Sequence, residues 1–87
     1  MWHVYMVKCR DGSYYTGITT DIERRIKEHN SSPQGARYTR ARRPVTLCYC
    51  EDAASRSEAL KRELQIKKLS SHKKKLLAFR SNKHVTG

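Results

Sequence analysis

Five polar residues in this chain are of types that can together hydrolyse a phosphodiester bond: Tyr5, Tyr15, Arg25, His29 and Glu63. An arginine such as Arg25 can stabilise the charge on a phosphate in the transition state. A glutamate such as Glu63 can hold one hard divalent cation, whose coordination is completed by water and substrate phosphate. A tyrosine hydroxyl has a pKa of about 10, so it needs help from a metal, a lysine or a histidine before it acts as a base.

Each of these residues also has an ordinary structural interpretation. Tyrosines in strands usually pack, and an arginine and a histidine four apart on a helix usually face solvent. Glu63 lies in an apolar stripe with Ala59, Leu60 and Ile66, where a carboxylate must find a cation or hydrogen-bond donors. A salt bridge would meet that need as well as a metal, so the residues alone leave both interpretations open.

The two tyrosines belong to a predicted β-hairpin whose strands cover residues 2–9 and 13–19. A two-residue Asp11-Gly12 turn would place Tyr5 and Tyr15 on opposite faces. A three-residue loop, Arg10-Asp11-Gly12, would place both tyrosines on the same face if Gly12 takes a left-handed conformation.

The three-residue loop pairs Tyr5 with Gly17 and Val7 with Tyr15, and it separates polar from apolar side chains better. We therefore prefer this register. It gathers His3, Tyr5, Tyr15, Gly17 and Thr19 on one face and leaves Val4, Met6 and Ile18 on the other, which we expect to be core.

A helix of about ten residues is predicted next, opened by a capping box that starts at Thr20. Ile22 and Ile26 repeat at helical spacing and are expected to face the sheet. Arg25 and His29 lie four apart on a neighbouring stripe, so their side chains can reach a common point.

Three further elements are predicted after this helix. Residues 44–51 alternate as a third strand, and Ser55 caps a helix that extends to about Leu69. Residues 70–79 form a last helix, in which we expect Leu76, Leu77 and Phe79 to carry the packing.

The charge balance indicates the class of partner. The chain has 19 Lys and Arg against 8 Asp and Glu, a net charge of +11, which favours nucleic acid over a merely soluble cationic surface or an anionic membrane. Arginines bind phosphates and an interleaved tyrosine can stack on a base. We expect nucleic acid to contact Gly17, Arg37, Tyr38, Thr39, Arg40, Arg42 and Arg43.

The cysteines and the apolar pattern indicate a compartment. No apolar stretch is long enough to span a bilayer, and the N-terminus lacks the pattern of a signal peptide. The odd set of Cys9, Cys48 and Cys50 has no CxxC spacing. These features predict a cytoplasmic protein that does not bind membranes.

The order of these motifs resembles the GIY-YIG nuclease superfamily. Val4-Tyr5 stands in the first motif, Tyr15-Thr16-Gly17 in the second, and Arg25 follows that glycine by eight residues. Glu63 in Glu58-Ala59-Leu60-x-x-Glu63 looks like the metal-binding glutamate of the family. The match covers about residues 2–79 and is similar to the small stand-alone bacterial members.

The resemblance implies an α+β fold, a three-stranded antiparallel sheet flanked by helices in the order β-β-α-β-α-α. It implies one domain over residues 1–80, which leaves 81–87 as a flexible C-terminal tail. It also implies that Tyr5 and Tyr15 line the side of water attack, that Arg25 contacts the scissile phosphate, and that Glu63 binds Mg²⁺ or Mn²⁺.

The resemblance extends to one further residue and has one departure. His29 matches a histidine that some members carry one turn beyond the arginine. His3 stands where the first motif normally has glycine, on the face of the catalytic residues. Relatives that cut defined sites usually borrow specificity from a second domain, so we expect this chain either to be weakly specific or to be recruited by a protein partner that supplies specificity.

These considerations lead to a divalent-metal-dependent endonuclease that acts on DNA, of the repair or recombination type. The alternative is a non-catalytic nucleic-acid-binding module on the same scaffold, using residues 37–43 and the lysines at 73–75. A basic accessory protein held by a protein partner is a third interpretation. The set of Tyr5, Tyr15, Arg25 and Glu63 favours the first, because a pure binding module has no need of a lone acid on an apolar stripe.

Overall fold

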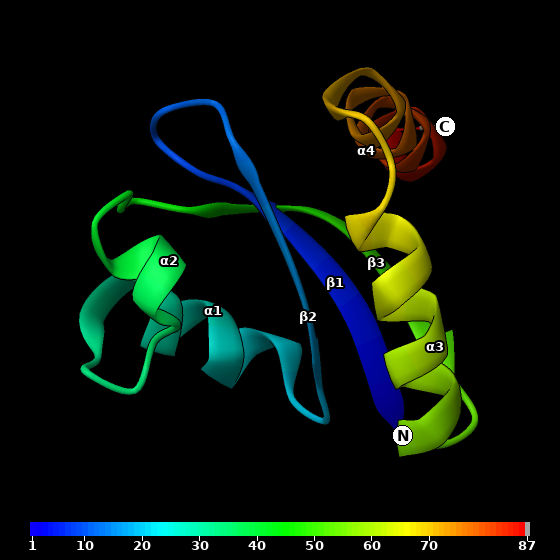
Figure 1. Cartoon of the computed structure of the whole chain (residues 1–87), viewed down its shortest axis with the longest axis horizontal. Helices are drawn as coiled ribbons and strands as arrows, with labels where there is room; N and C mark the ends of the chain where they lie inside the picture. Colours follow the sequence, from blue (N-terminus) through cyan, green and yellow to red (C-terminus); the bar gives the residue numbers. More distant parts are fainter. Residues whose placement is uncertain (87) are drawn as a thin grey trace.

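The computed structural model describes residues 1–86, with side chains to Arg80. Its elements in chain order are β1 (Trp2–Lys8), β2 (Tyr14–Thr19), α1 (Ile22–Ser31), α2 (Arg37–Arg40), β3 (Thr46–Ala53), α3 (Arg56–Lys67) and α4 (Ser71–Thr86). The expected α+β order is confirmed, with the short α2 in addition. Figure 1 shows α1 and α2 on one side of the sheet and α3 and α4 on the other. None of the helices in this part of the chain has the length and apolar character needed to cross a bilayer.

The sheet is antiparallel, with strand order β2-β1-β3, so β1 is paired on both sides. The predicted hairpin register is confirmed, since Tyr5 pairs with Gly17 and Val7 with Tyr15. Gly12 has a φ of 86°, a left-handed conformation that favours glycine, and its N–H donates to the Cys9 carbonyl at 2.9 Å. The three-residue loop therefore sets which side chains of the hairpin share a face.

The central strand β1 is buried on both faces, and alternating side chains enter two separate cores. Val4 and Met6 pack with residues of α3 and α4, which are Ala59, Ile66 and Ala78. Tyr5 and Val7 pack on the other face with Cys9 and Val45, against the partly buried Tyr15, Ile22 and Ile26. The predicted sheet-facing role of the two isoleucines of α1 is thus confirmed.

Two helix caps are predicted from the sequence, and one of them is shifted by a residue. Ser55 caps α3 as expected, since its hydroxyl accepts from the Glu58 N–H at 3.2 Å. The cap of α1 is Asp21, whose carboxylate accepts from the Arg24 N–H at 3.1 Å, and not Thr20. Thr19 explains the shift, because its hydroxyl accepts from the Asp21 N–H at 3.1 Å and extends the turn by one position.

The third strand begins and ends two residues later than predicted. A register shift between Met6 and Val7 forms a bulge opposite Cys48. The strict alternation expected from the sequence is interrupted there, and both Cys48 and Tyr49 pack on the Val4–Met6 core.

The packing face of α4 differs from the expectation. The helix approaches β3, and its buried or half-buried contacts come from Ala78 and Leu77. Leu76 and Phe79 are 48% and 63% exposed, so their predicted core role is wrong. Ala78 faces the sheet because its small side chain lets the helix approach closely, and that turns Phe79 outward. The backbone of α4 extends to Thr86. The flexibility predicted for the tail at 81–87 stays a prediction, because the side chains of these residues lie outside the described part of the chain.

Candidate active site

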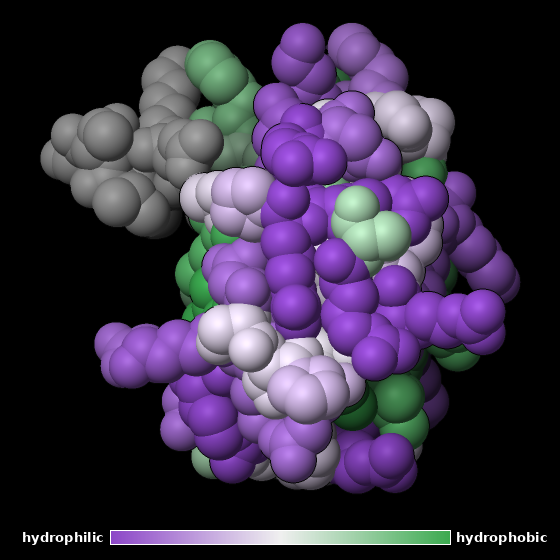
Figure 2. All heavy atoms as spheres, turned by 90° about the vertical axis from the view of Figure 1, so that its left-hand side faces the viewer, coloured by the Kyte–Doolittle hydropathy of each residue, from purple (hydrophilic) through white to green (hydrophobic). Residues whose placement is uncertain are grey.

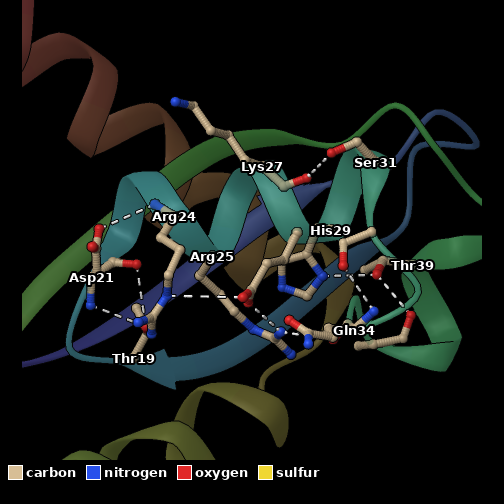
Figure 3. Close-up of polar contacts among 12 residues, drawn as sticks. Thr19, Asp21, Arg24, Arg25, Lys27, His29, Ser31, Gln34 and Thr39 are labelled. Carbon is tan, nitrogen blue, oxygen red and sulfur yellow. Dashed lines mark hydrogen bonds and ion pairs between the residues drawn. The ribbon is translucent and has the colours of Figure 1, made fainter.

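A chain of buried hydrogen bonds connects β1, α1 and α2. The Tyr5 hydroxyl lies 2.7 Å from Nε2 of His29, and Nδ1 of His29 lies 2.8 Å from the Thr39 hydroxyl. The Thr39 hydroxyl in turn donates to the Ala36 carbonyl at 2.9 Å. Figure 3 shows His29 and Thr39 facing each other between α1 and α2. Tyr5, His29 and Thr39 are all buried.

This chain of hydrogen bonds determines which atoms of Tyr5, His29 and Thr39 carry protons. Because the Thr39 hydroxyl has its single proton directed at Ala36, it can only accept from His29, which places the imidazole proton on Nδ1. Nε2 is then an acceptor, and Tyr5 donates to it. The tyrosine oxygen keeps its own acceptor capacity, so it can take a proton from a bound water while passing its own proton to His29.

Burial perturbs both titrating groups of the chain. Burial and, to a smaller extent, the nearby Arg25 charge together lower the pKa of His29 from 6.5 to about 4. Burial also raises the pKa of Tyr5 to about 12, a rise that the Arg25 guanidinium opposes and Glu63 slightly reinforces. In the free protein, His29 is therefore neutral and Tyr5 protonated near neutral pH.

Gly17 makes room for the Tyr5 hydroxyl. A Cβ built on Gly17 would lie 2.6 Å from the Tyr5 Oη and 2.8 Å from its Cζ. Real carbon atoms do not approach so closely, so the absence of a side chain at Gly17 is a condition for the position of Tyr5. The sequence predicted this juxtaposition, and the structure confirms the geometry.

Tyr15 lies beside the same histidine but in a different manner. Its ring packs edge-on against His29, with centroids 5.3 Å apart, and stacks on Tyr38 at 6.1 Å. The Arg42 guanidinium lies 3.9 Å from the centre of the Tyr38 ring. Tyr15 is half-buried. This stack joins the Tyr5 face of the hairpin to the basic segment at residues 37–43.

Arg25 lies next to Tyr5 and is held by its own neighbourhood. Its Nη1 donates to the Glu28 carboxylate at 3.0 Å and to the Gln34 carbonyl at 2.9 Å. Figure 3 shows Arg25 directed toward Gln34, below α1. Its guanidinium also contacts the Tyr5 hydroxyl, and the donors that these partners leave free are available to a phosphate.

The Glu63 carboxylate is only weakly paired with a cation. Its side chain is 14% exposed, and its one ion pair within residues 1–80 is to Lys67 at 3.6 Å, a neighbour on the same helix. No hydrogen bond to another described side chain or N–H restrains its oxygens. Glu63 is close enough to Tyr5 to raise its pKa, although α3 packs on the opposite face of β1.

The donor set fits a sparsely ligated metal. Within the described residues there is no cluster of three or more His, Cys, Asp or Glu. A hard cation such as Mg²⁺ commonly binds through one carboxylate and keeps several waters, whereas zinc requires three or four protein ligands. The largely buried Glu63 carboxylate, without a hydrogen-bond donor in this part of the chain, can supply that one ligand.

The segment at residues 37–43 was predicted to be one nucleic-acid-binding unit, but the structure divides it into exposed and internally bound residues. Arg37, Tyr38 and Arg40 are exposed, and Figure 2 shows that the side carrying α1 and α2 is largely hydrophilic. Thr39 is fully buried and faces His29. Arg43 donates to the carbonyls of Glu28, His29 and Ser32 at the end of α1.

Thr39 and Arg43 thus bind other parts of the protein, Thr39 the His29 side chain and Arg43 the end of α1. The sequence did not suggest this structural role. A buried hydroxyl cannot reach a ligand at the surface, and the Arg43 guanidinium offsets the partial negative charge at the C-terminus of α1. Arg42 is intermediate, since its Nε pairs with Asp11 at 3.0 Å while its guanidinium lies over Tyr38. A phosphate would have to compete with Asp11 for it.

Three contributors to the site were missed by sequence reasoning. Glu28 anchors Arg25, and its position three residues later on the helix was a usable signal. Thr39 as the partner of His29 and the Gln34 carbonyl as a partner of Arg25 carry no local signal, because both depend on how the loop after α1 folds back. His3, on the same face as Tyr5, bonds Asp52 through Nδ1 at 2.8 Å.

Comparisons with known proteins identify the family of this chain. The profile of the family described as "GIY-YIG catalytic domain" matches residues 1–76. A UPF0213 protein of Desulfotalea psychrophila is 61% identical over 82 residues, which cover 94% of this chain and 74% of the relative. A UPF0213 protein of Halobacterium salinarum is 54% identical over 77 residues, which cover 88% and 99%.

Two solved structures show the same fold. The solution NMR structure of a UPF0213 protein from Bacillus halodurans is 47% identical, with a TM-score of 0.54 over 88% of this chain and 82% of that one. The solution NMR structure of a protein from E. faecalis is 42% identical, with a TM-score of 0.59 over 95% and 85%. By its family profile and by these relatives, the chain belongs to the GIY-YIG family, whose domain is that of a nuclease superfamily.

Proposed function

We propose that this protein is a divalent-metal-dependent endonuclease that hydrolyses phosphodiester bonds in DNA. The observation that supports it most is the Tyr5–His29–Thr39 chain, in which a buried neutral imidazole is oriented to accept a proton from a tyrosine. A packing tyrosine has no need of a histidine whose tautomer is fixed by a third residue. We also place the protein in the cytoplasm, since the three cysteines are free.

Tyr5 and His29 move the proton of the attacking water. The water proton goes to the Tyr5 oxygen as the Tyr5 proton goes to Nε2 of His29, so the tyrosine never carries a full negative charge. Arg25 couples this transfer to substrate binding. Its charge helps to hold the His29 pKa down in the free protein, and a bound phosphate that neutralises it makes His29 a stronger base.

Arg25 binds the scissile phosphate through the donors that Glu28 and Gln34 leave free, and it stabilises the added charge of the pentavalent transition state. Glu63 would hold Mg²⁺ or Mn²⁺, which supplies charge neutralisation at the phosphate and the leaving oxygen when bound. Tyr15 orients the imidazole by edge-on packing. The exposed residues Arg37, Tyr38 and Arg40, with Arg42, contact the flanking nucleic acid.

The test is nicking of supercoiled plasmid by the purified chain with Mg²⁺ or Mn²⁺. Glu63→Gln and Arg25→Ala should abolish nicking. Glu58→Gln should not, because Glu58 is an exposed acid on the same helix. Nicking that survives both active-site substitutions would reveal a contaminating nuclease and contradict the assignment. DNA binding without nicking, unaffected by Glu63→Gln, would instead identify a non-catalytic binding module.

A panel of labelled DNA and RNA structures, cut in parallel with both metals, identifies the substrate. We expect DNA to be cut in preference to RNA of the same sequence. Adding a cell extract to the same assay tests for the protein partner that we expect to supply specificity, because such a partner would restrict the cleavage sites without changing their dependence on Glu63.

A further inference from the structure

A hollow that the candidate active site does not use lies between α4 and the sheet. It has a volume of about 200 Å³ and is lined by Lys8, Tyr14, Cys48, Lys75, Ala78 and Phe79; we refer to it as the α4 hollow. Its lining residues include the hairpin ends of β1 and β2 and part of α4, and these segments lie at the top of the view in Figure 1. The hollow therefore combines side chains from the sheet and from the last helix.

Its chemistry is aromatic and cationic. Tyr14 is half-buried while Phe79 is 63% exposed, so a large aromatic ring is held in solvent beside a second one. Lys8 and Lys75 are both exposed. No acid lines the hollow, and the sequence has no Asp or Glu after Glu63. Aromatic rings flanked by lysines are the combination on which unpaired bases stack while their phosphates are neutralised.

The α4 hollow continues toward the basic segment at residues 37–43. A neighbouring hollow of about 460 Å³ shares Lys8 and Cys48 with it and extends to Arg10. The Arg10 N–H donates to the Arg42 carbonyl at 3.0 Å. A cationic path thus runs from the side of α2, across the hairpin end, to α4.

We propose that the α4 hollow binds an unpaired nucleotide of a nucleic acid whose backbone follows this path. The inference rests on the proposed function for its choice of nucleic acid, and it adds a substrate class, namely one with a single-stranded segment. A duplex has its bases stacked internally and offers no free ring to Tyr14 and Phe79. A second copy of this chain is disfavoured as the occupant, because it carries the same net charge of +11.

The hollow on the other side of α4 serves as an internal comparison. It is lined by Leu69, Lys73, Leu76, Leu77 and Arg80. It is also apolar and cationic, but none of its described lining residues has an aromatic ring on which a base could stack. Leu76, 48% exposed, is therefore a matched control for Phe79 on the same helix.

The experiment measures binding of a labelled single-stranded DNA oligonucleotide to the full chain in EDTA, by fluorescence anisotropy. Phe79→Ala should weaken binding by roughly fivefold or more, the range found for losing one base–aromatic stack. Lys75→Ala should weaken it by less, and Leu76→Ala should leave it unchanged. Phe79→Trp should bind at least as well as the parent. Thermal melts followed by circular dichroism check that each variant folds.

Phe79→Leu distinguishes stacking from simple apolar contact. If the hollow binds a base, the leucine variant should bind as poorly as the alanine variant. If leucine restores binding, or if Phe79→Ala binds like Leu76→Ala, the proposal is overturned, and an apolar protein partner becomes the better occupant.

The outcome separates this proposal from the proposed hydrolysis. Nicking that depends on Glu63, together with single-strand binding indifferent to Phe79, would refute the nucleotide site alone. Phe79-dependent binding without any nicking would support the nucleotide site and refute hydrolysis. Absence of binding to single-stranded DNA, together with absence of nicking in Mg²⁺ and Mn²⁺, would refute both.

Discussion

The Tyr5 hydroxyl lies 2.7 Å from Nε2 of His29, a residue 24 positions later in the chain. The Tyr5 hydroxyl also contacts the Arg25 guanidinium, whereas Nε2 of His29 has no second hydrogen-bond partner within residues 1–80. Without the Tyr5 hydroxyl, this buried nitrogen would therefore be left without a hydrogen bond. The pair therefore contributes to stability and, by our proposal, to proton transfer, and the two contributions are separable by substitution.

Tyr5→Phe should separate them most directly, since it removes only the hydroxyl. We expect the nicking rate to fall by roughly 100-fold or more, the scale of general acid–base catalysis. The free energy of unfolding should fall by about 1–3 kcal/mol, because Nε2 of His29 is left without a donor. Single-turnover nicking and urea unfolding measure the two effects.

Tyr49→Phe is the matched control for Tyr5→Phe. Its hydroxyl donates to Glu51 at 3.1 Å, on the other core of the molecule, so nicking should persist. Wild-type nicking by the Tyr5→Phe protein would remove Tyr5 from the mechanism.

Gly17→Ala should inactivate the protein through Tyr5. The new Cβ would lie 2.6 Å from the Tyr5 Oη, which forces the hydroxyl away from His29 at a cost of about 1–3 kcal/mol. Gly12→Ala makes a good comparison, because it strains a backbone with a φ of 86° by about 1–2 kcal/mol but meets no neighbouring atom. Both variants should melt at lower temperature, and only Gly17→Ala should lose nicking. Equal loss in both would indicate a general effect of stability.

Thr39→Val tests the tautomer of His29. Valine keeps the shape of threonine but leaves Nδ1 of His29 without an acceptor, so the imidazole is free to carry its proton on Nε2, where it would repel the Tyr5 proton. We expect a lower kcat with little change in KM, and a loss of about 1–3 kcal/mol in unfolding free energy. Thr39→Ser should restore both quantities. A serine variant as impaired as the valine variant would indicate a packing role only.

His29 should make the stability depend on pH in acid. Its pKa is about 4 in the folded protein against 6.5 for an unperturbed histidine, so the unfolded chain binds more protons between these values. The free energy of unfolding should therefore rise with pH across this window. On acidification from pH 6.5 to pH 5, it should fall by about 1.5 kcal/mol. Urea unfolding at several pH values measures this slope. His29→Gln should flatten it, whereas His72→Gln, at an exposed position, should not.

The hairpin and α3 could be predicted from the sequence because their signals are local. The Arg10-Asp11-Gly12 loop specifies its own register, and Ser55 caps the helix that follows it. The cap of α1 is Asp21 and not Thr20, because the Thr19 hydroxyl accepts from the Asp21 N–H and forms a turn there. The spacing of the residues alone does not distinguish these two caps.

The rest depended on contacts between distant segments. Thr39 joins His29 and Arg43 joins the end of α1 only because residues 32–36 fold back, which no periodicity encodes. The outward face of Phe79 follows from the close approach of Ala78 to the sheet. Composition predicted the buried and exposed residue types, but not which apolar side chain of a short amphipathic helix faces in.

Several arginines of this basic chain are already engaged within it. Arg43 neutralises carbonyls of α1, Arg42 pairs with Asp11, Arg62 with Glu51 and Arg25 with Glu28. Each cation that binds a DNA phosphate releases condensed counterions, and the steepness with which affinity falls as salt rises counts those contacts. Arg43 and Arg62 should release few or none, whereas Arg25 and Arg42 can contact a phosphate only through the donors that their acidic partners leave free. The measured counterion number should therefore fall well short of the count of lysines and arginines, and it should report the exposed surface alone.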